Sequence, residues 1–211
     1  MPMTLLLVRH GATAANVARP YMLQGAQPDS ELIDVGVLQA QAASHAIAAF
    51  PVVKIYCSPL VRARTTAEII AARLTVPLEV DARLIEANIG DWSGLTWEEI
   101  DRRWPSEHAA FQENAAQHGY PGGENLAQVR ERVLPVIERL VAVHPGETIA
   151  VVGHGVVNRV LLAHWLGIPL RQARQLPQHN AGFSIIEFLD GVARVRKVNV
   201  AEHLETVAAA A

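Results

Sequence analysis

Three short apolar segments, each ending abruptly at a turn, constrain the fold of this chain more than any other feature. They span residues 4–8, 52–57 and 148–152, and a turn and then a helical pattern follow each of them. Short continuous apolar runs bounded by turn signals are typical of buried strands. Because strands that alternate with helices favour a parallel sheet, the pattern predicts an α/β protein.

The remaining segments complete this pattern. Residues 84–94 contain two glycines, an asparagine and a tryptophan, which predicts a structured loop. Residues 95–120 are expected to form a small helical cap inserted over the sheet edge, and residues 207–211 a disordered tail. Ser58 and Pro59 are interpreted as the N-cap and first residue of a helix. Further helices are expected at 35–50, 125–143 and 156–166, and further strands at 77–80, 183–188 and 193–200, the last two as a hairpin.

Composition narrows the class of protein. The 211 residues, half of them hydrophobic, suffice for one domain with a sizeable core, which we expect to span residues 1–211. The net charge of −3 argues against nucleic-acid binding, which usually requires a basic surface. No apolar run reaches membrane-spanning length and no signal peptide is recognisable, so we expect a cytoplasmic protein that binds no membrane. The single cysteine excludes an intramolecular disulfide, and alanine-rich surfaces would permit a homodimer.

Basic side chains gather at the ends of the three predicted strands. Arg9 and His10 end the first strand. Arg62 and Arg64 open the helix after the second, and His154 follows the third. Residues two apart on a helix do not share a face, so only one of these two helical arginines can point to the strand ends. Since the carboxyl ends of parallel strands meet at one edge, the cluster predicts a site for a small anion, and phosphate fits best.

The same residues have the chemistry for phosphoryl transfer. A neutral imidazole can attack phosphorus and form a phosphohistidine, while arginines neutralise the phosphate oxygens and lower the pKa of the imidazole. The residues alone leave open whether His10 or His154 is the nucleophile; the other imidazole, protonated, would stabilise the transferring group. A carboxylic acid must protonate the departing oxygen. Glu86 is the candidate, because its apolar neighbours Leu84 and Ile85 are expected to raise its pKa.

Several motifs resemble those of the histidine phosphatase superfamily, which has the phosphoglycerate mutase-like fold. They follow one another along nearly the whole chain, at residues 7–16 (Leu-Val-Arg-His-Gly-Ala-Thr-Ala-Ala-Asn), 23–25 (Leu-Gln-Gly), 57–67 (Cys-Ser-Pro-Leu-Val-Arg-Ala-Arg-Thr-Thr-Ala), 86 (Glu), 90–94 (Gly-Asp-Trp-Ser-Gly), 121–124 (Pro-Gly-Gly-Glu) and 152–155 (Val-Gly-His-Gly). The resemblance implies a three-layer α/β/α fold, in which helices flank a mostly parallel sheet.

The resemblance also implies roles for particular residues. His10 would be the phosphorylated nucleophile and Glu86 the proton donor, while Arg9, Arg62 and His154 complete the phosphate pocket. No cofactor and no metal are implied. The residues that would contact the phosphate or the rest of the substrate are Thr13, Asn16, Gln24, Gly25 and Gly155, and Asn180 resembles a further position near the pocket.

The superfamily contains hydrolases and mutases, and local sequence favours a phosphatase similar to α-ribazole and broad-specificity phosphatases. Cofactor-dependent mutases resemble Glu-Arg-x-Tyr-Gly after the acid, whereas Glu86 is followed here by Ala-Asn-Ile-Gly. Only 67 residues lie between Glu86 and His154, which is short for a mutase. Residues 90–94 resemble the phosphatase pattern Gly-x-Trp-Glu-Gly, with Ser93 in place of glutamate. We therefore expect a small phosphorylated metabolite as substrate and inorganic phosphate as product.

Three alternatives stay open at this stage. Mutases carry an arginine pair in the region of Arg102 and Arg103, although a solvated helix is the favoured interpretation here. His10, His154 and Glu86 could be metal ligands, but flanking arginines make a poor cation site. A pseudo-phosphatase that only binds a phosphorylated ligand is the non-catalytic alternative. The remaining histidines are expected to be structural or exposed, and Trp92, Trp97 and Trp104 to pack in the core or cap rather than to line a substrate site.

Overall fold

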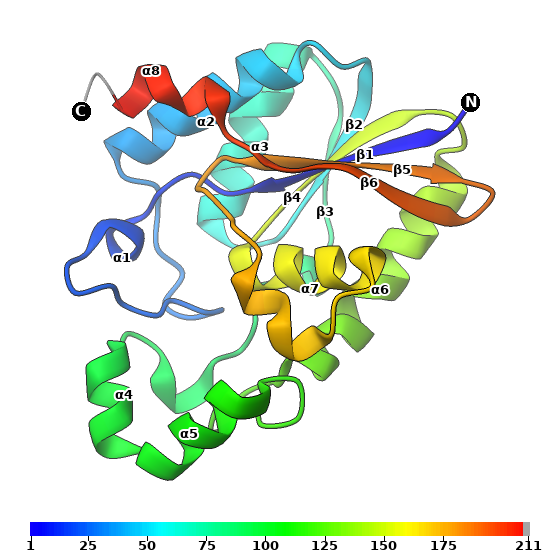
Figure 1. The fold of residues 1–211 in the computed structure, drawn as a ribbon. Helices are drawn as coiled ribbons and strands as arrows, with labels where there is room; N and C mark the ends of the chain where they lie inside the picture. The colour runs from blue at the N-terminus through cyan, green and yellow to red at the C-terminus, as the bar shows by residue number, and fades with distance from the viewer. Residues whose placement is uncertain (209–211) are drawn as a thin grey trace.

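The computed structural model describes residues 1–208, and its centre is one six-stranded sheet (Figure 1). The neighbouring strands β2, β4 and β1 are parallel, as is the short edge strand β3, whereas β5 runs antiparallel to both of its neighbours. This confirms the predicted mostly parallel sheet and the C-terminal hairpin. The strands in spatial order are β3 (Leu78–Val80), β2 (Val52–Cys57), β4 (Thr148–Gly153), β1 (Met3–Arg9), β5 (Phe183–Leu189) and β6 (Val192–Val200).

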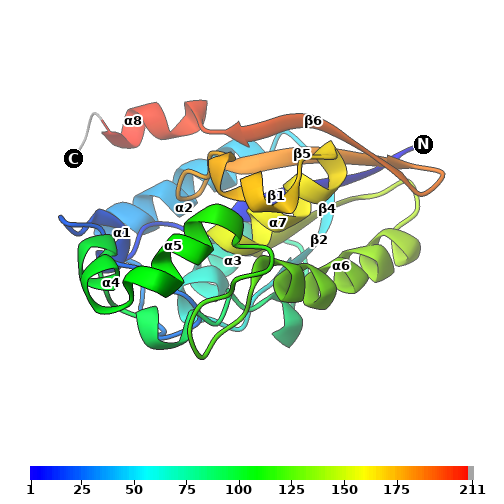
Figure 2. The same ribbon diagram turned by 60° about the horizontal axis from the view of Figure 1, so that its bottom comes forward.

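Helices cover both faces of the sheet, which confirms the three-layer α/β/α architecture (Figures 1 and 2). Helices α2 (Asp34–Ile47) and α3 (Val61–Leu74) lie on one face. Helices α6 (Leu126–Val143) and α7 (Gly155–Leu166) lie on the other. The side chains of β1 alternate between these layers, because successive residues of a strand point to opposite faces. Leu6 and Val8 pack with α2 and α3, whereas Leu5 and Leu7 pack with α6 and α7.

The 95–120 region forms two short helices, α4 (Trp97–Arg103) and α5 (Pro105–Asn114), which lie apart from the sheet on the side of α6 and α7 (Figure 1). Thr96 and Glu99 form a capping box at the start of α4. A buried aromatic cluster fastens the two helices to the preceding and following loops: the ring of Phe111 lies 5.1 Å from that of Trp92 and 4.7 Å from that of Tyr120. Aromatic packing therefore holds α4 and α5 in place.

Two local predictions differ from the structure. Ser58 and Pro59 precede the helix, because α3 starts at Val61 with Leu60 as its N-cap, and the Ser58 hydroxyl is used elsewhere. The predicted disordered tail is wrong for residues 207–208: they belong to α8 (Glu205–Ala208), where Val207 is buried, while residues 209–211 lie outside the described part of the chain. The other short elements are α1 (Ala14–Val17) and the 3₁₀ turns η1 (Ala82–Leu84), η2 (Gly90–Trp92), η3 (Leu170–Gln175) and η4 (Glu202–Leu204).

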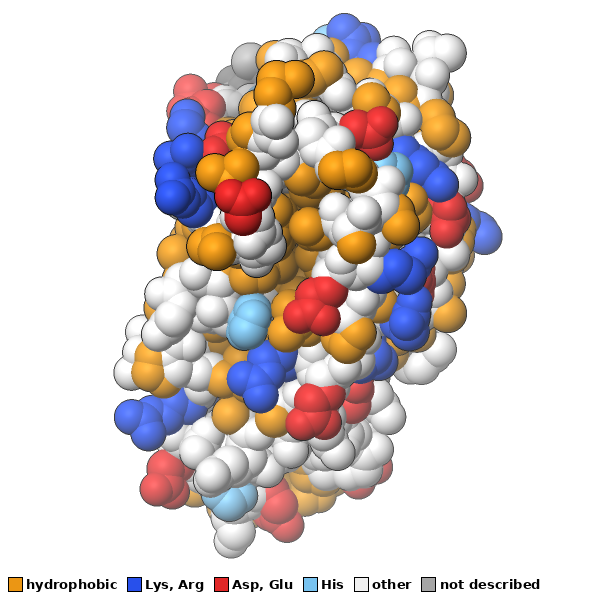
Figure 3. Space-filling view, turned by 90° about the vertical axis from the view of Figure 1, so that its right-hand side faces the viewer, with side chains coloured by type: hydrophobic (Ala, Val, Ile, Leu, Met, Phe, Trp, Pro, Cys, Tyr) orange, Lys and Arg blue, Asp and Glu red, His pale blue; other side chains and the backbone are white. Residues whose placement is uncertain are grey.

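The outer surface mixes apolar and charged side chains. Figure 3 shows the face that carries the tip of the β5–β6 hairpin, where apolar side chains lie between lysines, arginines and acidic residues. Leu189 and Val192 at that hairpin are exposed. Within residues 1–208, none of the helices combines the length and apolar character needed to cross a membrane. A homodimer stays a prediction.

Candidate active site

The ends of β1, β2 and β4 bring the predicted basic residues together. Arg9 pairs with Gly153 in the parallel register of β1 and β4, so His10 and His154 leave the sheet side by side. Their ring centroids are 5.2 Å apart. Arg62, in the first turn of α3, is only 1% exposed. Its charge acts on both imidazoles, and the charge of Glu86 acts on Arg62. Arg64 instead lies at the surface beside Glu68, which confirms Arg62 as the arginine that faces the site.

Hydrogen bonding sets the protonation of His10. Its Nδ1 lies 2.7 Å from the carbonyl oxygen of Gly11, and because a carbonyl can only accept, Nδ1 carries the proton. Burial, followed by the charges of Arg9 and Arg62, lowers the pKa of His10 well below 6.5. The ring is therefore neutral near pH 7, and Nε2 keeps its lone pair without a hydrogen-bond partner among the described residues.

Gly11 fixes the backbone beside this imidazole through close packing. A Cβ atom at Gly11 would lie 2.3 Å from the carbonyl oxygen of Gly36 in α2, so no side chain fits there. The backbone N–H of Gly11 donates to the Thr66 hydroxyl of α3. The glycine after His10 is therefore required for close approach of the backbone to α2.

His154 is fully buried, and its surroundings contradict one prediction. Its Nε2 forms a 2.7 Å hydrogen bond with the Ser58 hydroxyl at the end of β2, while its Nδ1 is buried without a partner among the described residues. Burial, His10 and the nearby arginines all lower its pKa well below 6.5. The prediction of a protonated second imidazole is therefore wrong for this arrangement, because two cations and a dry environment disfavour a third charge. Ser58 was missed as a site residue, although its place at a strand end was a usable signal.

The two pocket arginines have buried donors without acceptors. Arg9 donates from Nη1 to the carbonyl oxygen of Gln178 at 2.5 Å, and Arg62 donates from Nη2 to that of Gly25 at 2.6 Å. Nε of Arg9, and Nε and Nη1 of Arg62, are buried without a hydrogen-bond partner in the described residues. Asp29 lies 3.7 Å from Arg62 Nη1, at the edge of ion-pair range. Buried N–H donors normally have partners, so this arrangement suits a ligand rich in acceptor oxygens.

The side chain of Glu86, from the loop after η1, lies against the N-terminus of α7. Its carboxylate accepts backbone N–H bonds from Ala87 at 2.9 Å, Val156 at 3.1 Å and Val157 at 3.3 Å. The apolar neighbours predicted for Glu86 are therefore only part of its surroundings, because the free N–H groups of a helix N-terminus also reach this side chain. Glu86 is nevertheless nearly buried and lines the same cleft as Arg9 and Arg62.

The predicted substrate-contacting residues fall into two groups. Thr13 is fully buried and does not line the cleft; its hydroxyl lies 3.1 Å from Asn16 Oδ1 and 3.0 Å from Gln24 Oε1. It therefore positions Asn16 and Gln24, and its predicted contact with the phosphate or the rest of the substrate stays a prediction. Asn180 donates to the His10 carbonyl at 3.1 Å and to Asn16 Oδ1 at 3.0 Å, which confirms its position beside the pocket. The predicted residues that do line the cleft are Asn16, Gln24, Gly25 and Gly155.

These residues surround a cleft of about 270 Å³, and His10 and His154 lie behind its lining. Sequence reasoning missed Tyr21, Tyr120, Arg159 and Arg174, which also line it. Arg159 carried a usable signal, since it follows Gly155 by one helical turn, and so did Tyr21, since its loop follows Arg9 and His10 directly. The remaining lining residues are Arg9, Leu23, Arg62, Glu86, Ile89, Trp97, Leu126, Val156, Val160 and Ala173.

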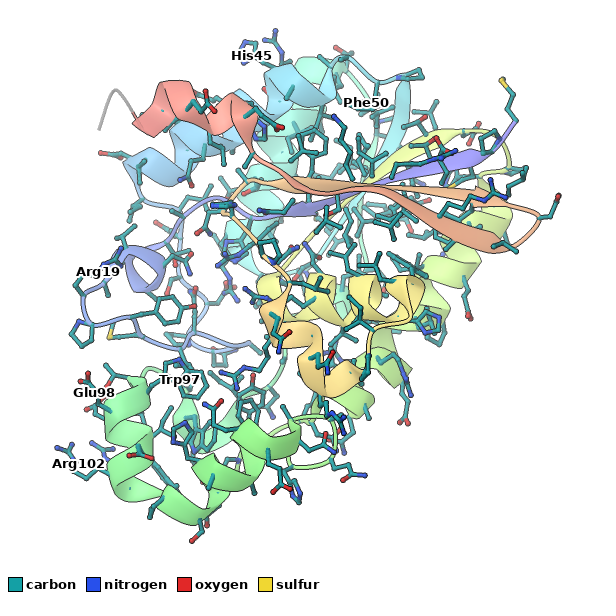
Figure 4. The ribbon with its side chains drawn as sticks, viewed as in Figure 1. Arg19, His45, Phe50, Trp97, Glu98 and Arg102 are labelled. Carbon is teal, nitrogen blue, oxygen red and sulfur yellow. The ribbon has the colours of Figure 1, made fainter. Side chains whose placement is uncertain are left out.

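Helix α4 has one side toward the cleft and one toward solvent (Figure 4). Trp92 is a buried core residue, as expected. Trp97 lines the cleft, although it was expected only to pack in the core or cap. Arg102 and Arg103 are exposed, and Arg103 lies 3.7 Å from Glu99 of the same helix. The structure thus places this arginine pair in solvent, away from the cleft. Among the described residues, no group of three or more His, Cys, Asp or Glu is arranged to hold a metal ion.

A mostly parallel α/β sheet with two imidazoles, a buried and a partly buried arginine and a carboxylate at its C-terminal edge defines a site suited to a small anion. The chain belongs to the histidine phosphatase superfamily (branch 1), whose family model matches residues 5–201. This confirms the resemblance in the sequence.

Relatives and solved structures agree with this membership. The chain is 31% identical to phosphoserine phosphatase 1 of Hydrogenobacter thermophilus, over 95% of this chain and 93% of the relative. It is 35% identical to the glucosyl-3-phosphoglycerate phosphatase of Mycolicibacterium vanbaalenii, over 79% and 75% of the two chains. The solved structure of YhfR from Bacillus stearothermophilus superposes with a TM-score of 0.88 at 33% identity, covering 96% of this chain and 100% of that chain.

The lowered pKa values of the two imidazoles predict a pH-dependent stability. Below about pH 6.5 the unfolded chain binds more protons than the folded one, so the free energy of unfolding should fall between about pH 7.5 and about pH 5.5. Urea denaturation at both pH values should show a smaller fall in a His10→Gln/His154→Gln variant. His45→Gln, at an exposed position on α2 far from the site, is the control and should behave as the wild type. An undiminished fall in the double variant would contradict the prediction.

Proposed function

We propose that this protein is a metal-independent phosphomonoester hydrolase that acts through a covalent phosphohistidine on His10. The observation that carries this proposal is the neutral His10 imidazole, whose free Nε2 lies among buried arginine donors without acceptors. A nucleophile needs a lone pair, and a transferring phosphoryl group needs donors for its oxygens. One site supplies both.

The proposed reaction has two steps. His10 Nε2 attacks phosphorus, the bond from phosphorus to the ester oxygen breaks, and Glu86 gives a proton to the departing oxygen. Water then attacks the phosphohistidine, Glu86 takes up the proton, and inorganic phosphate leaves with the imidazole restored. Arg9 and Arg62 hold the phosphoryl oxygens in both steps. His154 joins them by donating from Nδ1, the nitrogen that its hydrogen bond with Ser58 leaves unpaired.

The substrate-binding roles follow from the cleft. Asn16 and Gln24 line it, and buried Nε2 of Gln24 has no partner among the described residues, so both amides are proposed to donate to substrate oxygens. Gly25 is proposed to act indirectly, since its carbonyl oxygen holds Arg62 Nη2. Gly155 is proposed to let substrate approach, because a Cβ there would lie 3.6 Å from Arg9 Nε.

Two relatives carry phosphatase names, for glucosyl-3-phosphoglycerate and for phosphoserine, which supports hydrolysis of a small phosphorylated metabolite. A mutase must retain a bisphosphorylated intermediate and bind a substrate carboxylate. The arginine pair that the sequence offered for this purpose, Arg102 and Arg103, lies in solvent. The hydrolase is therefore the favoured function and the mutase the alternative.

Replacing the nucleophile tests the central proposal. His10→Ala should lower hydrolysis of p-nitrophenyl phosphate by about 10³-fold or more, because no other group can form the covalent intermediate. Brief incubation of the wild type with a radiolabelled phosphomonoester should leave an acid-labile label on His10. The control His45→Ala removes an exposed histidine on α2 and should keep full activity (Figure 4). Robust turnover by His10→Ala would refute the mechanism.

The proton-donor role predicts a dependence on the leaving group. Glu86→Gln should lower kcat by about 10²–10⁴-fold for an alkyl phosphate, whose alkoxide cannot leave unprotonated. The loss should be much smaller for p-nitrophenyl phosphate, because nitrophenolate leaves without a proton. Glu98→Gln, an outward-facing carboxylate on α4, is the control (Figure 4). Equal losses for both substrates would show that Glu86 acts only through binding or folding.

The mutase alternative has its own test. With 3-phosphoglycerate and a trace of 2,3-bisphosphoglycerate, phosphorus NMR should show release of inorganic phosphate and little 2-phosphoglycerate. The physical reason is that a mutase must retain a bisphosphorylated intermediate against water, and the exposed Arg102 and Arg103 cannot hold that intermediate in the cleft. If isomerisation is faster than the hydrolysis of this and other monoesters, the protein is a mutase.

A further inference from the structure

Two arginines on the cleft take no part in the proposed phosphoryl transfer. Arg159 comes from α7 and Arg174 from η3, and both line the same cleft as Arg9 and Glu86. The Cβ position of Gly155 is 3.3 Å from Arg159 Nη1 and 3.6 Å from Arg9 Nε, so Arg159 reaches the rim of the phosphate pocket. The cleft thus extends its positive charge beyond the phosphate-binding arginines.

Both side chains are fixed by contacts that leave donors available. Arg159 donates from Nε to the carbonyl oxygen of Leu176 at 2.8 Å, while its two terminal nitrogens have no hydrogen-bond partner among the described residues. Arg174 donates from Nη1 to Gln112 Oε1 at 2.9 Å. Its guanidinium lies 4.9 Å from the ring centroids of both Trp97 and Phe111. Ordering these flexible side chains in advance lowers the entropy cost of binding a ligand.

No carboxylate neutralises this pair within residues 1–208. Neither arginine has an ion pair there within 4.0 Å, and the acidic groups that act on the site, Glu86 and Asp29, act on Arg62. Burial and the charge of Arg159 lower the pKa of Arg174. Two partly buried cations that repel one another without a counter-charge are unfavourable, and a bound anion would relieve this.

We propose that Arg159 and Arg174 form a second anion subsite, so that the preferred substrates are small phosphomonoesters carrying a second anionic group. This rests on the proposed phosphatase function for the first subsite. The cleft that contains both subsites is also lined by Tyr21, Leu23 and Leu126, aromatic and aliphatic side chains that suit a short carbon skeleton. Arginine binds carboxylate and phosphate through the same planar fork, so either group satisfies the subsite.

Matched substrates test the subsite during turnover. 3-Phosphoglycerate and glycerol 3-phosphate differ only in a carboxylate against a hydroxymethyl group, and glycerol 1,3-bisphosphate offers a second phosphate instead. The wild type should prefer either doubly anionic ester, and the better of the two identifies the second group. The ratio of interest is kcat/KM for a doubly anionic ester divided by kcat/KM for the singly anionic one. Arg174→Met and Arg159→Met should each lower this ratio by about 10- to 100-fold, the change in affinity expected when one hydrogen bond to a charged group is lost. Arg174→Lys should restore part of the ratio.

The control variant is Arg171→Met, which removes an exposed arginine from the same turn, η3, and should leave the ratio unchanged. Circular dichroism checks that each variant folds. A wild-type ratio near one, or a ratio that both methionine variants leave unchanged, would overturn the subsite. So would an equal fall in Arg171→Met, because that result would reflect general surface charge.

A binding measurement separates this proposal from the phosphatase function. In the His10→Ala background, which cannot turn over, calorimetry should give a Kd for 3-phosphoglycerate about 10- to 100-fold lower than for glycerol 3-phosphate, and Arg174→Met should abolish the difference. If the wild type hydrolyses nothing but this difference appears, the phosphatase proposal fails and the subsite stands. If monoesters are hydrolysed but the two ligands bind equally, the subsite fails alone.

Discussion

The parallel pairing of β1 with β4, and of β4 with β2, is the constraint on which the rest of the structure depends. Antiparallel partners would send consecutive strand ends to opposite edges of the sheet, whereas parallel partners send them to the same edge. The register pairs Arg9 with Gly153 and Cys57 with Val152. His10, Ser58 and His154 therefore leave the sheet together, although His10 and His154 are 144 positions apart in the chain.

This convergence creates a concentrated, largely dry cluster of nitrogen donors. Burial of a guanidinium without a full set of partners is unfavourable, and Arg62 is only 1% exposed. The imidazoles respond by staying neutral, which the lowered pKa values of His10 and His154 express. Burying these groups without partners lowers stability, which is typical of a site that is built to bind a ligand. A bound anion would supply acceptors for the arginine N–H donors that folding leaves without partners.

Much of this site could be predicted from the sequence, and the remainder could not for definable reasons. Strand ends followed by turns are local signals, and they located Arg9, His10 and His154; the helical angle and the resemblance then chose Arg62 over Arg64. The hydrogen bond between Thr13 and Gln24 could not be predicted, because it depends on how the 18–29 loop folds back. Arg174 was missed because its neighbours Trp97 and Phe111 are some 60 to 80 residues away in the chain.

Local pattern by itself determined the α/β class, the strand–turn–helix units and the chemistry of the strand ends, since apolar periodicity and turn residues act over a few positions. Only the tertiary structure decided which groups are charged and which face the cleft. The protonation state of His154 depends on its burial near Arg62 and Arg9, which are far from it in the sequence. The position of the Glu86 carboxylate depends on the N-terminus of α7, whose N–H groups bind it. Electrostatic and desolvation effects act through space, and the sequence does not show directly which residues are close in space.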